Sequence, residues 1–156
     1  MQELRTALEE AGFVDVRTYL QSGNVVLSST SSPERVASEV ERLIADRFGL
    51  DIGIVVRTRD ELAQVVKRNP LGTVATSPKL HQVTFLDGEP DVELLRKLDA
   101  TAAGSEELVH VGRELYAWHP DGVGRSKLAA LLSGRALGGT ARNWTTVTAL
   151  LAIADE

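Results

Sequence analysis

The sequence predicts an α+β fold made of two related lobes, each a split β-α-β unit with mixed or antiparallel sheets and helices on one face. Apolar residues recur at helical spacing in some segments and alternate in others. A helix–hairpin–helix order occurs in residues 2–49 and again in 91–132, and residues 71–79 between them have turn and linker composition. We therefore expect lobes at 1–75 and 76–156 that form one compact structural domain.

The first lobe opens with a helix followed by a hairpin. Leu4, Ala7, Leu8 and Ala11 share one face of a helix over residues 2–11. Residues 16–20 and 24–28 are apolar, β-favouring runs around Gln21-Ser22-Gly23, whose glycine suits a tight turn. This pattern predicts two antiparallel strands.

Three further elements are expected in the first lobe. Ser32 and Pro33 are typical of a helix start and Gly49 of its end, which predicts a helix between them. Residues 52–56 are apolar and predict a buried strand. A short helix is expected from Arg59 to just before Asn69-Pro70.

The second lobe repeats this order behind an additional strand. The predicted elements are a strand at 80–86, a helix from about 91, strands at 107–111 and 114–118, a helix at about 125–132 and a last helix capped by Thr140. A turn at Gly112-Arg113 joins the two middle strands.

The two lobes differ in their first strand. In a β-α-β-β-α-β unit of the ferredoxin-like type, the first strand lies inside the sheet beside the last. The second lobe has that strand at 80–86, whereas the first lobe begins directly with its helix. Three explanations fit this difference: the true start of the protein lies upstream, another chain supplies the strand, or the sheet closes differently. Under the second, we expect open sheet edges at 24–28 and 52–56, where a strand of another chain can pair.

Two separated segments carry a family resemblance. They are residues 17–26, Arg-Thr-Tyr-Leu-Gln-Ser-Gly-Asn-Val-Val, and residues 139–147, Gly-Thr-Ala-Arg-Asn-Trp-Thr-Thr-Val. Together with residues 69–71, 115–118 and 124–128, they resemble the uncharacterised bacterial family catalogued as domain of unknown function 1697. The resemblance implies two related α+β lobes and brings no established reaction, cofactor or substrate. It also implies an N-terminal strand and loop that this sequence lacks.

Composition excludes several classes of protein. The chain has 156 residues, no cysteine and a net charge of −5. Without thiols it has no disulfide framework, no cysteine-based metal site and no thiolate nucleophile. The longest apolar run, 149–154, is far shorter than the ~20 residues that span a bilayer. We expect a cytoplasmic domain with no membrane partner, and the acidic balance disfavours duplex nucleic acid.

One region is basic and suggests an anion site. Residues 113–142 carry a net charge of +3, which leaves −8 for the rest of the chain. Within it, Gly124, Arg125, Ser126 and Lys127 precede one predicted helix, and Arg142 and Asn143 lie in the first turn of another. Helix N-termini attract anions, so these residues are the candidate ligands for a phosphate or carboxylate. The alternative is that they are turn, cap and surface residues.

The remaining polar candidates are weaker. His119, beside the glycine-containing loop, is a candidate general acid or base, and Ser22 and Asn24 are candidate ligand-binding groups in the hairpin turn. The spacing of the three histidines predicts no metal site, and nothing indicates a cofactor.

The leading hypothesis is therefore a domain that binds a small anionic molecule. The alternatives are a protein-interaction or homo-oligomeric module that uses exposed sheet edges, and a hydrolase or transferase of unknown class.

Overall fold

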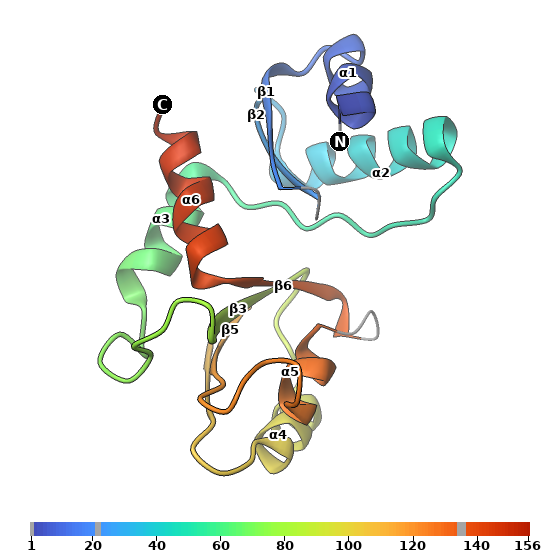
Figure 1. Cartoon of the computed structure of the whole chain (residues 1–156). Coiled ribbons are helices and arrows are strands. Elements are labelled where there is room, and N and C mark those ends of the chain that lie inside the picture. Colours follow the sequence, from blue (N-terminus) through green and yellow to red (C-terminus); the bar gives the residue numbers. More distant parts are fainter. Residues whose placement is uncertain (1, 21–22, 134–136) are drawn as a thin grey trace. The chain divides into compact units, whose positions relative to one another are not determined.

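The structure, a computed structural model, describes residues 2–20, 23–133 and 137–156. It consists of two compact units (Figure 1). Unit 1 comprises Met1–Leu62 and Ala149–Glu156, and unit 2 comprises Ala63–Thr148. The boundary between the two lobes of the sequence repeat, placed above after residue 75, stays a prediction.

Unit 1 holds two complete helices, parts of α3 and of the C-terminal helix, and a two-stranded antiparallel sheet. In order these are α1 (Gln2–Glu10), β1 (Val14–Tyr19), β2 (Asn24–Ser28) and α2 (Pro33–Phe48), followed by the start of α3 (Arg59–Arg68). The order of elements predicted for this part of the sequence is confirmed up to residue 48.

The two ends of α2 are formed by the capping residues that predicted them. The Ser32 hydroxyl accepts a hydrogen bond from the backbone N–H of Arg35, and Pro33 occupies the first turn. Gly49 ends the helix at φ 66°, a left-handed conformation that costs glycine little, and its N–H donates to the Ala45 carbonyl at 3.0 Å. Both ends of α2 are therefore fixed by local interactions.

The core of unit 1 lies between the hairpin and its two helices. Buried residues of α1, β1 and α2 form it: Leu8, Val16, Val36, Val40 and Ile44. Partly buried side chains from β2 and from the segment after α2 pack against it, including Val25, Leu27, Ile54 and Val56. The apolar residues that recur periodically in these segments thus form the core of unit 1.

Unit 2 contains a four-stranded antiparallel sheet. Its strands are β3 (His81–Leu86), β4 (Glu107–Val111), β5 (Glu114–Trp118) and β6 (Gly139–Asn143), arranged in the order β4-β5-β3-β6. β3 pairs with both β5 and β6, as the first strand of a split β-α-β unit does. The predicted α+β fold is confirmed.

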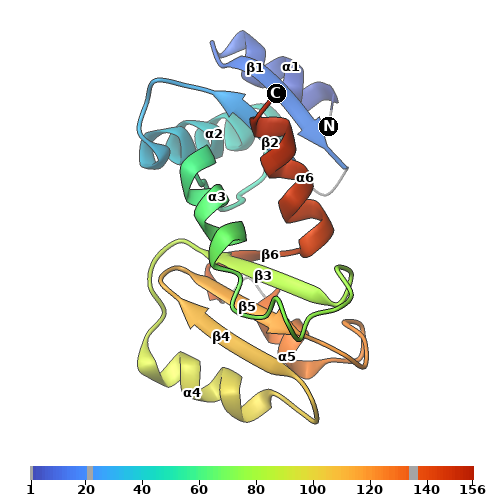
Figure 2. The same ribbon diagram turned by 90° about the vertical axis from the view of Figure 1, so that its left-hand side faces the viewer.

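Helices lie on both faces of this sheet. α4 (Val92–Thr101) and α5 (Lys127–Leu132) cover one face with a cluster that includes Leu98, Leu128 and Leu132 (Figure 2). On the opposite face, the buried Tyr116 hydroxyl donates to the Val65 carbonyl of α3 at 2.8 Å. The expectation of helices on one face therefore holds for α4 and α5, while residues 63–68 of α3 add a second layer.

One predicted strand is wrong. Residues 51–58 contain no strand, although 52–56 have the apolar, β-branched composition of one. The backbone N–H of Ile54 donates to the Glu41 carboxylate of α2 at 3.0 Å instead of to a neighbouring strand. A strand needs a ladder partner, and no described strand pairs with this segment.

The start of the last helix is also corrected. Residues 139–143 form β6, and α6 (Trp144–Ala154) begins behind it with the Asn143 side chain accepting from the Thr146 N–H at 2.9 Å. Thr140 is therefore a strand residue and not the cap. A Cβ at Gly139 would lie 2.7 Å from the Phe85 carbonyl oxygen, so β6 approaches β3 closely where it begins.

Candidate functional site

The outer edge of β2 is the first candidate site, and it consists of backbone atoms. In the described part of the chain, β2 has a strand neighbour on one side only, which is β1. Alternate N–H and C=O groups of an edge strand point outward and can pair with another polypeptide. Residues Val25–Ser28 therefore offer a regular, unpaired ladder edge.

The opposite edge of the same sheet is less suited to pairing. The register of β1 shifts between Val14 and Arg17, and Asp15 adopts a positive φ of 52°. Such a bulge bends a strand and interrupts its outward hydrogen-bonding groups. In addition, Arg17 forms an ion pair with Glu156 at 2.9 Å. The irregularity of β1 makes β2 the better acceptor.

Residues 51–58 form an extended segment beside the same core. Ile54 and Val56 pack against the cluster that also receives Val25 and Leu27 of β2. Among the described residues, no backbone hydrogen bond joins this segment to β2. In Figure 1 the segment runs back along α2 before α3 begins. The segment thus contributes side chains to the core of unit 1 without joining its sheet.

Unit 2 contains a buried polar cluster that sequence reasoning identified only in part. The Oε2 atom of Glu106 accepts a hydrogen bond from the Ser126 hydroxyl at 2.5 Å and lies 2.7 Å from His119 Nδ1. The His119 side chain is fully buried, and that of Glu106 is 8% exposed. Ser126 Oγ also accepts the Ala129 N–H at 3.0 Å, which caps α5. The cluster fastens the start of α5 to the residue preceding β4.

The geometry of this cluster argues for a positioning role. With the proton on Nδ1 directed to Glu106, His119 Nε2 is left as the acceptor, and it has no hydrogen-bond partner among the described groups. Ser126 lies 3.3 Å from Nδ1 and donates its proton to the carboxylate. In a serine nucleophile site the hydroxyl faces the free ring nitrogen, which this hydroxyl does not. The His119 side chain is fully buried, so solvent does not reach its ring. A catalytic role of His119 stays a prediction.

The charge state of Glu106 follows from the same contacts. Burial by itself raises the pKa of the Glu106 carboxyl, because it penalises the ionised form. Hydrogen bonds from Ser126 and His119 stabilise the carboxylate and outweigh that effect, so the pKa lies below its ordinary value. No motif marks Glu106 in the sequence, because it precedes β4 next to the exposed Glu107 and resembles an ordinary surface acid.

The predicted anion ligands lie on different faces of the unit 2 sheet. Arg142 is paired with Val83 in the ladder, and directly opposed residues share a face. Val83 is likewise paired with Tyr116, which faces α3, whereas α5 packs against the other face. The structure therefore does not bring Arg142 together with the residues that precede α5.

Each group of predicted ligands has its own local role. Gly124 and Arg125 form an exposed turn, and Lys127 is the exposed first residue of α5. Arg142 is half-buried and donates to Thr140 Oγ1 and the Ala141 carbonyl, and burial lowers the pKa of its guanidinium.

The Oδ1 of Asn143 caps α6, as described above. Binding of a phosphate or carboxylate by either group of residues stays a prediction.

Of the two candidate ligand-binding residues in the hairpin, Ser22 and Asn24, the structure describes only Asn24. Ser22 lies outside the described residues. The Asn24 side chain is buried, and its Nδ2 donates to the Tyr19 carbonyl at 3.1 Å. This bond spans the hairpin and is sufficient to explain an asparagine at the position.

Another histidine and a tryptophan form a stacked pair. The rings of His81 and Trp144 lie 4.5 Å apart with an interplanar angle of 13°. Burial lowers the pKa of His81, because it disfavours the cation. Over the described ranges, no three His, Cys, Asp or Glu residues are placed to hold a metal ion. The pair therefore contributes packing at the end of the sheet where β3 begins.

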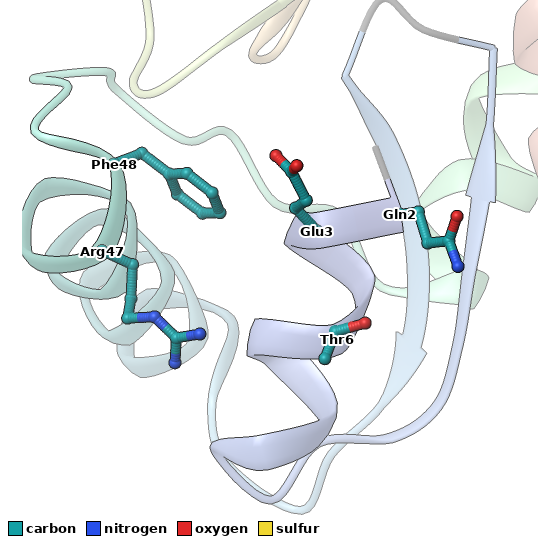
Figure 3. Close-up of a pocket in the computed structure, with 5 residues that line it drawn as sticks. All are labelled: Gln2, Glu3, Thr6, Arg47 and Phe48. Carbon is teal, nitrogen blue, oxygen red and sulfur yellow. The ribbon is translucent and has the colours of Figure 1, made fainter.

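A shallow surface hollow lies between α1 and α2. It has a volume of about 650 Å³ and is lined by Gln2, Glu3, Thr6, Arg47 and Phe48 (Figure 3). Arg47 forms an ion pair with Glu10 at 3.0 Å, and both side chains are about half exposed. The lining mixes acidic, basic and aromatic groups without a buried polar atom directed into the hollow. It offers little selectivity for one ligand.

The family follows from a comparison with protein-family models. Residues 1–116 match the model described as "Protein of unknown function (DUF1697)". The chain belongs to this family. The resemblance inferred from residues 17–26 is thereby confirmed, and DUF1697 carries no assigned activity.

A solved structure supports the fold. The chain is similar to a conserved bacterial protein, SP0830 from Streptococcus pneumoniae, with a TM-score of 0.80 and 17% identity over 99% of this chain and 88% of that chain. At this identity the similarity shows the fold alone. A search of curated proteins finds no match. Within the residues that the structure describes, no helix has the length and apolarity needed to cross a bilayer.

Proposed function

We propose that this DUF1697 chain is a protein-interaction module, in which unit 1 binds an extended polypeptide along the edge of β2. The observation that carries the proposal is the regular outer edge of β2, which has no strand neighbour among the described residues. Strand addition of this kind takes its affinity from main-chain hydrogen bonds and its specificity from alternate side chains.

The surroundings of β2 favour an incoming strand over a small molecule. Val25 and Leu27 are partly buried side chains on the core face of the strand. Alternate residues of a neighbouring strand would extend that face and bury further apolar surface. The bulged β1 directs pairing to β2 and not to the other side of the sheet.

A peptide copy of residues 80–87 is a suitable probe, because it is the sequence that fills the middle of the unit 2 sheet. We expect saturable binding of the labelled peptide by fluorescence anisotropy. Complete N-methylation of the peptide backbone retains the side chains and removes every N–H donor, so we expect it to abolish binding.

A pair of chain variants locates the contact. Val26→Lys places a charge in β2, whereas Val14→Lys places it in β1 at a position that is 58% exposed. We expect the first to weaken peptide binding and the second to leave it unchanged, with circular dichroism confirming that both variants are folded. Absence of saturable binding, or binding that is indifferent to N-methylation, would overturn the proposal.

A further inference from the structure

We propose that the outer edge of β4 is an interface with a second copy of this chain, in which the two β4 strands pair antiparallel about Val109. The surface consists of residues 107–111. The pairing joins the unit 2 sheets of two copies edge to edge. It concerns unit 2 alone and is independent of the peptide-binding edge proposed for β2.

The outer edge of β4 is regular. Among the described strands, β4 has a neighbour on one side only, which is β5 (Figure 2). Its register with β5 runs without a shift from Glu107 to Val111. Natural edge strands are commonly protected by a lysine, a proline or a bulge. The sequence of β4, Glu-Leu-Val-His-Val, has none of these, and its one acid stands at the end of the strand.

The pairing of the neighbouring strands shows which backbone groups of β4 point outward. The His119 N–H donates to the Leu80 carbonyl, so the alternate residues 115, 117 and 119 bond toward β3. Residues 114, 116 and 118 therefore bond toward β4, where they face 111, 109 and 107. The N–H and C=O groups of Leu108 and His110 are left on the outer edge.

Antiparallel pairing about Val109 uses this whole edge. It places Leu108 of one copy opposite His110 of the other, so each copy satisfies the outward N–H and C=O groups of its mate. The His110 imidazole lies 2.6 Å from the Gly112 carbonyl oxygen of its own chain. That oxygen already has a partner, and the free edge therefore ends at Val111.

Charge and apolar surface favour a second copy as the occupant. Glu107 begins β4, and Arg113 lies in the turn that ends it. Antiparallel pairing brings the acidic end of each copy beside the basic end of the other, whereas parallel pairing would set Glu107 against Glu107. Between the charges, Leu108, Val109 and Val111 are half-buried, so pairing covers apolar surface of both copies. The edge is therefore complementary to itself.

The size of the interface sets the expected strength. A stable protein–protein interface of standard size buries about 1,600 Å² in total. A pair of five-residue edges buries less than this. We therefore expect a dimer that dissociates on dilution.

Cysteine cross-linking tests the register, because the chain has no cysteine of its own. In the proposed pairing the two Val109 residues are opposite each other in a non-hydrogen-bonded pair, with Cα atoms about 4.5 Å apart, a separation that a disulfide spans. We expect Val109→Cys to form a disulfide-linked dimer on mild oxidation.

Val111→Cys is the matched control. Val111 is half-buried and lies on the same face of β4 as Val109. In the proposed register, however, its two copies are offset by about 14 Å along the strands. We expect this variant to cross-link at least about tenfold more slowly, since a disulfide does not reach that far.

Sedimentation equilibrium of the chain, from micromolar to millimolar concentration, measures the association itself. We expect a concentration-dependent dimer for the parent chain and for Val26→Lys, which changes β2. Val109→Lys places two like charges opposite each other at the centre of the interface, so we expect it to stay monomeric. Circular dichroism shows whether the variants fold, and if Val109→Lys does not, the two cysteine variants decide.

Equal cross-linking rates for the two cysteine variants would overturn the β4 interface, and so would a parent chain that stays monomeric at millimolar concentration. Association that Val26→Lys abolishes and Val109→Lys leaves unchanged would assign the interface to β2 and overturn it as well. Peptide binding at β2 is measured separately with the labelled peptide, so failure of either proposal is recognised by its own assay.

Discussion

Replacement of Ser126 by alanine tests the buried cluster of unit 2. The hydroxyl caps α5 through the Ala129 N–H and donates to Glu106 Oε2 at 2.5 Å. Loss of an N-cap costs about 1 kcal/mol, and loss of a hydrogen bond to an ionised group costs about 1.5–3 kcal/mol. We therefore expect Ser126→Ala to lower the free energy of unfolding by about 3 kcal/mol.

The matched control is Asp91→Ala, which removes the N-cap of α4 in the same unit. Asp91 Oδ1 accepts the Leu94 N–H at 2.7 Å, so this variant loses a cap alone and costs about 1 kcal/mol. Both tryptophans, Trp118 and Trp144, lie in unit 2, so their fluorescence during urea unfolding reports on this unit.

A double-mutant cycle with Glu106→Gln isolates the contact between the two side chains. We expect a coupling of about 1–2 kcal/mol. Equal losses for the Ser126 and Asp91 variants, together with a coupling near zero, would refute the reasoning.

Three further outcomes are expected. Tyr116→Phe removes the buried hydroxyl bond to α3 and should cost about 1–3 kcal/mol in urea unfolding, whereas Tyr19→Phe should cost little. Gly139→Ala places a Cβ 2.7 Å from the Phe85 carbonyl oxygen, and calorimetry should show a loss of roughly 1–3 kcal/mol. Because the folded-state pKa of Glu106 is depressed, its stabilisation is complete above the ordinary carboxyl pKa and is lost as pH falls through the folded value. Acid titration of Glu106→Gln should therefore show a weaker pH dependence than that of the parent chain.

Local signals predicted those elements that depend on local interactions. Ser32, Pro33 and Gly49 define α2 because capping bonds and a left-handed φ are properties of a few adjacent residues. The strands β3, β4 and β5 were predicted for a related reason, since their apolar residues meet the core directly. The repeat also predicted that β3 lies inside the sheet, whereas β6 was not predicted.

Elements that depend on distant partners were not predictable in the same way. Residues 52–56 have the composition of a strand, yet a ladder requires a neighbour, and Glu41 binds the Ile54 N–H instead. Thr140 has the chemistry of a helix cap, but pairing with β3 places it in a strand. In both cases tertiary contacts decided between two locally acceptable structures.

The candidate sites show the same limit. Charge and helix position suggested that Arg142 joins the residues before α5, but strand register places it on the opposite face of the sheet. Glu106 is separated from His119 by 13 positions and from Ser126 by 20, and no sequence motif links them. Contacts between side chains that lie far apart in the sequence cannot be predicted from their spacing, because they depend on the path of the loops between them.

The central claim is that no strand of the described part of the chain pairs with the outer edge of β2 or with residues 52–56, and hydrogen exchange of the chain alone tests it most directly. We predict strong protection of β3, which pairs on both edges, and rapid exchange in residues 52–56 apart from Ile54. Protection of residues 52–56 as strong as that of β3 would show that the segment already has a ladder partner, and it would contradict the account.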